Sequence, residues 1–218
     1  MMCSNNSGSK NHQAAITISS VRRIHGKAIL TLSTGETLSM PRAMLREKPY
    51  KSGMLFDHGE HEAFLNNRSY SFAMEKAGAA LTSRARTEKE LVDTLIKNAY
   101  PEQTIARVMA YLVEAGYIKD AAFAQQWAAS RSSKGLGSRR IRMELRQKGI
   151  RQEDIDEAVS SVGEDAELRG AIMTAEKASR GKDLNSPADR QRILAALARR
   201  GYGYSVAKHA INTLLNGK

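Results

Sequence analysis

The spacing of hydrophobic residues changes near His61. Before that point apolar and polar side chains alternate, at Ile16 and Ile18 and again over residues 28–32, which is typical of short, half-buried strands. Turn-forming residues separate these segments, so we expect two or three antiparallel strands. Pro41 suits the first position of a short helix that runs through Arg46.

Beyond about His61, hydrophobic residues recur at helical spacing to the end of the chain. Thr87, with Glu90 three residues later, has the pattern of a capping box and predicts the start of a helix. Gly116 predicts a helix end, and Asp120 is expected to cap the helix that follows. Almost every long segment after residue 70 is therefore predicted to be helical, with short loops between the helices.

One arrangement of residues occurs three times in the helical part. Two apolar residues lie four positions apart, a small residue follows, and another apolar residue comes directly after it. The small residue allows a turn with positive φ, which glycine adopts easily and alanine less well. The small residues are Ala99, Gly149 and Gly201, spaced by 50 and 52 positions. The apolar residues are Leu91, Leu95 and Tyr100, then Ile141, Leu145 and Ile150, then Ile193, Leu197 and Tyr202.

Each copy is preceded by one more helical segment and followed by another, so the repeating unit has three helices. The predicted fold is mainly α: an elongated, curved array of three tandem three-helix repeats, preceded by a small β-rich N-terminal segment. The predicted leading helices cover residues 70–83, 121–133 and 166–180. The expected domains are a disordered tail (1–14), a β-rich subdomain (15–66) and repeats at 67–118, 119–163 and 164–218.

The charge of the chain is unevenly distributed. The formal net charge is +11, of which residues 1–69 carry +4, residues 70–118 carry 0, residues 119–163 carry +3 and residues 164–218 carry +4. A basic excess favours nucleic acid or an acidic protein surface as the partner. The alternative is a soluble protein whose surface is simply positive.

The sequence lacks the motifs that are typical of several classes of enzyme. The chain contains no phosphate-binding loop, no nucleophile elbow, no HExxH and no dinucleotide fingerprint, so no enzymatic activity and no cofactor is expected. The single cysteine, Cys3, lies in the polar tail, which excludes a disulfide framework. No membrane span or export signal is present, and a cytoplasmic protein is expected. Residues 57–62 (DHGEHE) lie in an expected loop without zinc-type spacing, so no metal site is predicted.

Two basic clusters are the candidate binding residues. The first spans residues 131–151 and includes a glycine-containing linker, expected to be flexible, over residues 132–137 and the helix after it. On its helix Arg139, Arg142 and Arg146 share one face, away from Ile141 and Leu145. The alternative is an ordinary solvated helix face. The first cluster is Arg131, Lys134, Arg139, Arg140, Arg142, Arg146, Lys148 and Arg151, and the second is Arg190, Arg192, Arg199 and Arg200.

The aromatic residues of the repeats have two interpretations. They could be stacking platforms for bases, but their fixed places in the repeat favour packing in the core. The residues concerned are Tyr100, Tyr117, Phe123, Trp127 and Tyr202.

The stretch AGYIKDAAFAQQWAASR is followed by a basic linker and by RIRMELRQKGI. With these motifs, the chain from about Tyr70 to Lys218 resembles the RecX family of bacterial RecA regulators. Lys119 stands where an acid is common in the family, and Ala99 where glycine is common. The positions that carry the resemblance are Gly116-Tyr117-Ile118, Asp120, Phe123-Ala124, Arg131, Gly137, Ile141, Glu144-Leu145 and Gly149-Ile150.

The resemblance implies a regulatory protein that acts in DNA repair, recombination and the SOS response. Such a protein binds the RecA nucleoprotein filament in its helical groove and restrains ATP hydrolysis, strand exchange and coprotease activity. It implies weak direct DNA binding as a secondary property, and we expect a monomer. The alternative is an independent, non-specific DNA-binding protein built from helix-turn-helix-like units.

Overall fold

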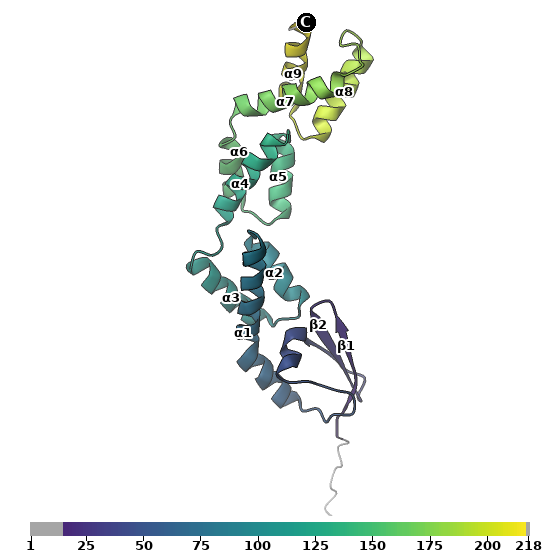
Figure 1. Ribbon diagram of the computed structural model, residues 1–218, viewed down its shortest axis with the longest axis vertical. Helices are drawn as coiled ribbons and strands as arrows, with labels where there is room; N and C mark the ends of the chain where they lie inside the picture. The colour runs from purple at the N-terminus through teal and green to yellow at the C-terminus, as the bar shows by residue number, and fades with distance from the viewer. Residues whose placement is uncertain (1–14, 217–218) are drawn as a thin grey trace, which may run out of the picture. The chain divides into compact units, whose positions relative to one another are not determined.

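The computed structural model describes residues 15–216. This part of the chain holds three strands, a short 3-10 helix and nine α-helices (Figure 1). The structure confirms the predicted class, mainly α with three-helix repeats after a small β-rich segment. The predicted disordered tail of residues 1–14, with Cys3, lies outside the described residues. The curvature of the array and the predicted domain boundaries stay predictions.

The N-terminal strands form one antiparallel sheet in the order β1-β2-β3, which confirms the expected strands. Alternate side chains of the central strand are buried, because successive residues of a strand point to opposite faces. Pro41 is the last residue of β3 and precedes the 3-10 helix rather than starting it. The elements are β1 (Ile18–Ile24), β2 (Lys27–Leu32), β3 (Thr37–Pro41) and η1 (Arg42–Arg46).

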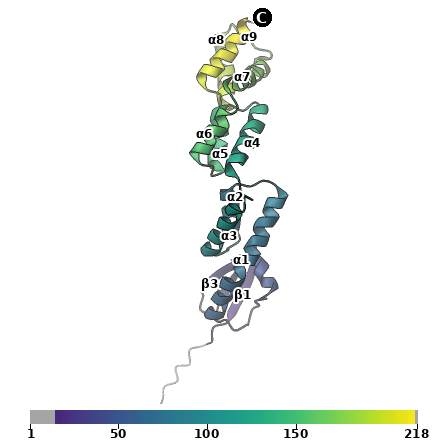
Figure 2. The same ribbon diagram turned by 90° about the vertical axis from the view of Figure 1, so that its left-hand side faces the viewer.

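The described chain divides into two compact units. The first contains the residues through Lys76 together with Thr94–Val108, and the second contains Ala77–Asp93 together with the residues from Met109 onward. Within the first unit, the sheet and η1 lie beside the first part of α1 (His58–Ser83) (Figure 2).

The start of α1 differs from the sequence prediction. Residues 58–62 form the beginning of the helix, not a loop, and the Asp57 carboxylate accepts a hydrogen bond from the backbone N–H of Glu60 at 2.8 Å. This is the bond of an N-capping aspartate. His61 is buried, and its Nδ1 lies 2.8 Å from the Tyr50 hydroxyl. Among residues 15–216 no three His, Cys, Asp or Glu side chains are grouped to hold a metal ion.

Each repeat consists of three consecutive helices: α1–α3, α4–α6 and α7–α9. In the second and third repeats every helix contacts the other two, and each of these repeats has its own buried apolar cluster. The helices after α1 are α2 (Glu88–Lys97), α3 (Glu102–Glu114), α4 (Asp120–Ser133), α5 (Ser138–Gln147), α6 (Gln152–Ser160), α7 (Glu164–Ser179), α8 (Pro187–Arg199) and α9 (Tyr204–Asn216).

The middle helix of each repeat ends in the same turn. The small residue has positive φ, 61° at Ala99, 82° at Gly149 and 90° at Gly201. The next residue donates its backbone N–H to the carbonyl of the leucine five positions earlier, at 3.2 Å in all three copies. This is a Schellman motif, in which the leucine and the following apolar residue also pack together. The predicted role of the repeated pattern is therefore confirmed. The donor and acceptor pairs are Tyr100 and Leu95, Ile150 and Leu145, and Tyr202 and Leu197.

Two helix caps test the capping predictions. Thr87 caps α2 as predicted, since its Oγ1 accepts a hydrogen bond from the Glu90 N–H at 3.2 Å. The prediction for Asp120 is wrong: it is the first residue of α4, and the preceding Lys119 makes no side-chain cap. The Asp120 carboxylate instead accepts a hydrogen bond from the backbone N–H of Glu88, at 3.1 Å. Asp120 thus serves the start of α2, where a negative side chain is favourable.

The stretch predicted to be a flexible linker is ordered. Ser132 and Ser133 belong to α4, Gly135 has a φ of 72°, and the Leu136 N–H donates to the Arg131 carbonyl at 3.1 Å. Leu136 also packs against the apolar cluster of the second repeat. These residues form another Schellman-type helix end, because a glycine at positive φ followed by a packed apolar residue is its usual signature.

Candidate binding cleft between the second and third repeats

The start of α5 is held by the third repeat. The Gly137 N–H donates to the Arg200 carbonyl at 3.0 Å, and the Arg139 N–H donates to the Gly201 carbonyl at 3.1 Å. The Ser138 N–H donates to a carboxylate oxygen of Glu167 on α7, at 2.9 Å. The first N–H groups of a helix have no partner within it, so these bonds satisfy them and fix the two repeats side by side.

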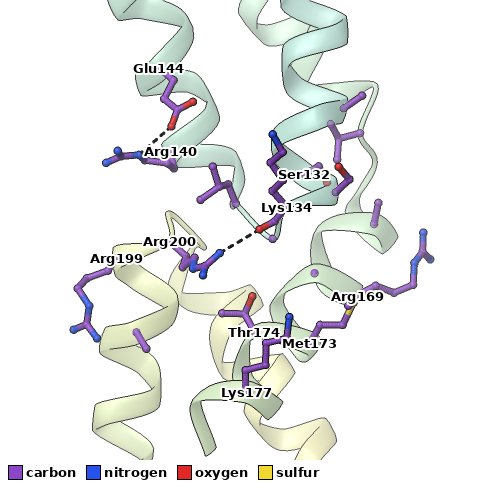
Figure 3. Close-up of a pocket in the computed structure, with 18 of the residues that line it drawn as sticks. Ser132, Lys134, Arg140, Glu144, Arg169, Met173, Thr174, Lys177, Arg199 and Arg200 are labelled. Carbon is purple, nitrogen blue, oxygen red and sulfur yellow. Dashed lines mark hydrogen bonds and ion pairs between the residues drawn. The ribbon is translucent and has the colours of Figure 1, made fainter.

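Beside this joint lies a cleft of about 1190 Å³. Figure 3 shows its walls, formed by the end of α4 and the start of α5 on one side and by α7 and the end of α8 on the other. Six of its lining side chains are positive and one is negative, Glu144. The positive residues are Lys134, Arg140, Arg169, Lys177, Arg199 and Arg200.

The single acid of the cleft is already neutralised. Glu144 accepts hydrogen bonds from Arg131 at 2.8 Å, from Arg140 at 3.3 Å and from the indole N–H of Trp127 at 3.1 Å. Arg200 donates to the Lys134 backbone carbonyl at 3.1 Å (Figure 3). The other four cations of the cleft make no ion pair with any residue of the described chain. The cleft therefore keeps a positive potential, which attracts anionic partners.

A buried tyrosine lies beneath the cleft. Tyr202 is 2% exposed, and its hydroxyl lies only 2.8 Å from the position that a Cβ on Gly170 would occupy. Burial raises the pKa of Tyr202, while the Thr174 hydroxyl and the Arg200 charge act in the opposite direction. Because Gly135 and Gly170 line the cleft at this point, the tyrosine can fill the space under them and support the turn that bears Arg200.

The predicted arginine face of α5 is present, and part of it is bound to α6. Ile141 and Leu145 are buried on the opposite side, as predicted. Arg142 forms an ion pair with Asp156, and Arg146 donates two hydrogen bonds of 3.1 Å to the Gln152 side chain. Hydrogen bonds from Gln152 and Arg142 lower the pKa of Asp156. Arg139 makes no ion pair with a described residue, so it is the freest of the three.

Two predicted cations belong to an internal network. Lys148 forms an ion pair of 2.6 Å with Glu90 of the first repeat and lies over the Trp127 ring at 4.3 Å. Arg131 lies over the same ring at 4.0 Å. Burial of Glu90 opposes its ionisation, but hydrogen bonds from Arg84 and Lys148 outweigh this and lower the pKa of Glu90. Such half-buried, cation–π contacts position a ring and its neighbours.

The remaining predicted cations are separated by the fold. Of the second cluster, Arg199 and Arg200 line the cleft, whereas Arg190 does not, and Arg192 pairs with Asp189 at 2.8 Å. Arg151 is paired with Asp154 on α6.

Two cations of the cleft were missed by the sequence analysis. Arg169 and Lys177 lie on α7, the leading helix of the third repeat, whereas the clusters were sought on the middle helices. The signal that could have found them is their spacing of eight residues, which places both on one helix face.

The aromatic residues divide between core and surface. Tyr100 and Tyr202 are buried, as predicted. Phe123 and Trp127 stack with ring centroids 5.6 Å apart and pack against the core of the second repeat while half-buried. Tyr117 is 63% exposed, so the prediction of core packing is wrong there. Its place directly after the Gly116 turn points the ring to solvent, whereas Ile118 is buried.

Two of the three repeats match models of a known protein family. Residues 73–112 match the family model described as the first three-helix domain of RecX, and residues 120–159 match the second three-helix domain. A solved structure titled regulatory protein RecX has a TM-score of 0.63 at 23% identity, covering 90% of this chain and 99% of that one. RecX from Lactobacillus salivarius also gives 0.63 at 22% identity, covering 67% of this chain and 96% of that one. These likenesses place the fold among tandem three-helix-repeat proteins.

Relatives that are similar in sequence show which family the chain belongs to. A protein named regulatory protein RecX from Mycolicibacterium vanbaalenii is 38% identical over 135 residues, which cover 58% of this chain and 73% of the relative. The relative of the same name from Streptomyces lividans is 35% identical over 139 residues, covering 62% and 73%. The chain belongs to the RecX family of regulatory proteins. None of the helices in residues 15–216 has the length and apolar character needed to cross a membrane.

Proposed function

We propose that the protein regulates the RecA recombinase by binding RecA–DNA filaments in their helical groove. It modulates, and mostly inhibits, the recombinase, ATPase and coprotease activities of the filament. It does so as a monomer in the cytoplasm and catalyses no reaction itself. The choice of RecA as the partner rests on membership of the RecX family; the relatives themselves are named regulatory protein RecX.

The observation that carries the proposal is the unbalanced charge of the cleft. Six cations face one carboxylate, and that carboxylate is held by Arg131, Arg140 and Trp127. A filament of protein on DNA offers both phosphates and acidic side chains, and a positive cleft attracts either.

The charge of the first repeat supports placing the contact surface on the second and third repeats. Its middle helix, α2, carries Lys89 and Lys97 but also Glu88, Glu90 and Asp93, so no basic face forms there. The basic surface is therefore not a by-product of the repeat pattern. The proposed contact set is Arg131, Lys134, Arg139, Arg140, Arg142, Arg146, Lys148, Arg151, Arg190, Arg192, Arg199 and Arg200, to which we add Arg169 and Lys177 because they line the cleft.

Within this set we assign different roles to paired and unpaired cations. Arg131 binds Glu144 directly, and Lys148 lies over the Trp127 ring, whose N–H donates to Glu144. We assign both an indirect role, since Glu144 in turn accepts a hydrogen bond from Arg140. The unpaired cations Arg139 and Arg199 contact the filament directly. A charge that is already paired gains less from a new partner than one that faces solvent, because the existing pair must first be broken.

A binding experiment tests the proposal against independent DNA binding. Fluorescently labelled single-stranded DNA is mixed with this protein, in the presence and absence of RecA and a non-hydrolysable ATP analogue, over a range of salt. We expect tight binding only when the RecA filament is present. Bare DNA could instead bind as tightly, with the logarithm of the binding constant falling against the logarithm of salt concentration by about 0.7 per phosphate contact. In that case the protein is an independent DNA-binding protein and the proposal is wrong.

A further inference from the structure

One face of α7 combines charge with an exposed apolar side chain. Arg169, Met173 and Lys177 are four residues apart and line the same cleft, so they form a stripe about 12 Å long at 1.5 Å per residue. Met173 is 58% exposed. Figure 3 shows the three side chains together on α7. An exposed methionine between two free cations has no evident role in folding.

The rest of the cleft lining repeats this mixture. Arg140 and Arg199 are cationic, and Leu136, Val162 and Ala196 are apolar. The cleft is thus lined by both positive and apolar side chains. A ligand that fits this lining has negative groups and at least one apolar group within about 12 Å, the length of the stripe on α7.

The cleft lacks the usual partner of nucleic-acid bases. None of the described residues that line it is aromatic, whereas proteins that hold single strands without reading sequence stack the bases on aromatic rings. Methionine, in contrast, is common at surfaces that bind varied peptides, because its flexible thioether adapts to apolar side chains. Arginine binds carboxylates through paired, charge-assisted hydrogen bonds.

We propose that this cleft binds an acidic polypeptide segment of the partner protein, with carboxylates on both sides of one apolar side chain. The carboxylates pair with Arg169, Lys177 and Arg199, and the apolar side chain covers Met173. The inference rests on the proposed function, since it makes the segment part of the recombinase rather than of the DNA. Binding of a phosphodiester backbone in the cleft is the competing outcome.

The structure also supplies a reporter of occupancy. The only tryptophan of the chain is Trp127, and its indole N–H donates to Glu144, which also accepts from Arg140 of the cleft. A ligand carboxylate that draws Arg140 away leaves Glu144 with one cation fewer. The hydrogen bond to the indole then changes, so tryptophan fluorescence should change as the cleft fills.

The test uses the full chain and a synthetic peptide, Gly-Glu-Glu-Leu-Glu-Glu-Gly. A second peptide replaces the leucine with glycine, and a thymidine oligonucleotide of equal charge is the nucleic-acid probe. Fluorescence anisotropy of labelled probes gives affinity, and Trp127 emission with unlabelled probes gives occupancy. The variants are Arg169→Glu with Lys177→Glu, Met173→Ser alone, and, as a control outside the cleft, the single charge reversal Lys208→Glu on α9. Circular dichroism and thermal melting check that each variant is folded.

The expected result is binding of the leucine peptide with a change in Trp127 emission. The Arg169 and Lys177 double reversal should weaken this binding at least about tenfold, since each lost charge pair contributes substantially to the binding free energy. Lys208→Glu should leave the affinity within about twofold, because it changes only a distant charge that salt screens. Met173→Ser should weaken the leucine peptide and leave the glycine peptide unchanged.

Three results overturn the inference. One is failure of the peptide to bind. Another is a loss of peptide affinity in Lys208→Glu as large as in the double reversal, which would mean that the peptide is attracted to any positive surface of the protein. The third is an oligonucleotide that binds more tightly than the peptide and loses that affinity in the double reversal, which would make the cleft a phosphate site. Inhibition of RecA by the unaltered protein is measured separately, so failure of the peptide with inhibition intact contradicts only this inference.

Discussion

The Thr87 hydroxyl donates a hydrogen bond of 2.8 Å to the backbone carbonyl of Lys148. Thr87 caps the start of α2, and Lys148 lies at the end of α5, so one side chain joins the first repeat to the second. The same relation recurs one repeat later, where the Arg200 carbonyl accepts from the Gly137 N–H. The end of α5 thus meets the start of α2, and the end of α8 meets the start of α5, an arrangement in which the helix dipoles are favourably aligned.

Replacing Thr87 tests this joint. Thr87→Val removes both the cap to the Glu90 N–H and the bond to Lys148, and we expect a loss of about 1–2 kcal/mol of unfolding free energy. Thr87→Ser keeps the hydroxyl and serves as the control, with most of the stability retained. Denaturant unfolding followed by circular dichroism measures both. Equal losses in the two variants would show that the hydroxyl is not the stabilising group.

The positive φ of Ala99 predicts a stabilising substitution. Alanine at a φ of 61° is strained by about 1 kcal/mol relative to glycine. Ala99→Gly should therefore raise the unfolding free energy by somewhat less than about 1 kcal/mol, because glycine also gains freedom in the unfolded chain. Thermal melting checks the sign, with a lower melting temperature as the contradicting result.

Gly149 should tolerate alanine less well than Gly163. Both have positive φ, 82° and 76°, so both pay the left-handed strain of about 1–2 kcal/mol. A Cβ at Gly149 would also lie 2.5 Å from the Lys89 Cβ, whereas one at Gly163 meets nothing within 4 Å. Gly149→Ala should be clearly the less stable of the two variants in denaturant unfolding. If the two lose the same stability, the repeats are not packed as closely there as the structure shows.

His61 predicts a loss of stability in mild acid. Its pKa is lowered from the ordinary value of 6.5 by burial first, and then by the charges of Lys48 and His58. The unfolded chain therefore binds the proton more readily, so the stability from neutral His61 is complete above pH 6.5 and is lost as pH falls from there towards the folded pKa. Denaturant unfolding in buffers above and below this window measures the loss. His61→Gln does not titrate and should show a smaller change; an equal change would assign the effect to other groups.

Much of the fold could be predicted from residues close together in the sequence. The pattern of Leu145, Gly149 and Ile150, with its copies, specifies a helix end whose hydrogen bonds span only six residues, so the sequence alone reveals it. The start of α1 was missed because its polar residues at 58–62 hide the helical period. The Asp120 cap was misplaced because its carboxylate serves a helix start that is 32 positions earlier in the chain.

The binding site could be predicted only in part. Sequence identifies which residues are positive, but not which of them meet an acid from another helix. Arg142 meets Asp156 and Lys148 meets Glu90, and both partners depend on how helices pack. Arg169 and Lys177 join Arg140 and Arg199 in the cleft only because the joint at Gly137 places the third repeat against the second.

The most direct test of the central claim is the DNA-dependent ATPase of RecA, titrated with this protein on single-stranded DNA. We expect the rate to fall at ratios below or equal to one protein per RecA subunit. The double variant Arg139→Glu, Arg199→Glu should need at least about tenfold more protein for the same effect, while Lys208→Glu should match the unaltered protein. An unchanged ATPase rate at equal ratios, with the protein folded by circular dichroism, would contradict the account.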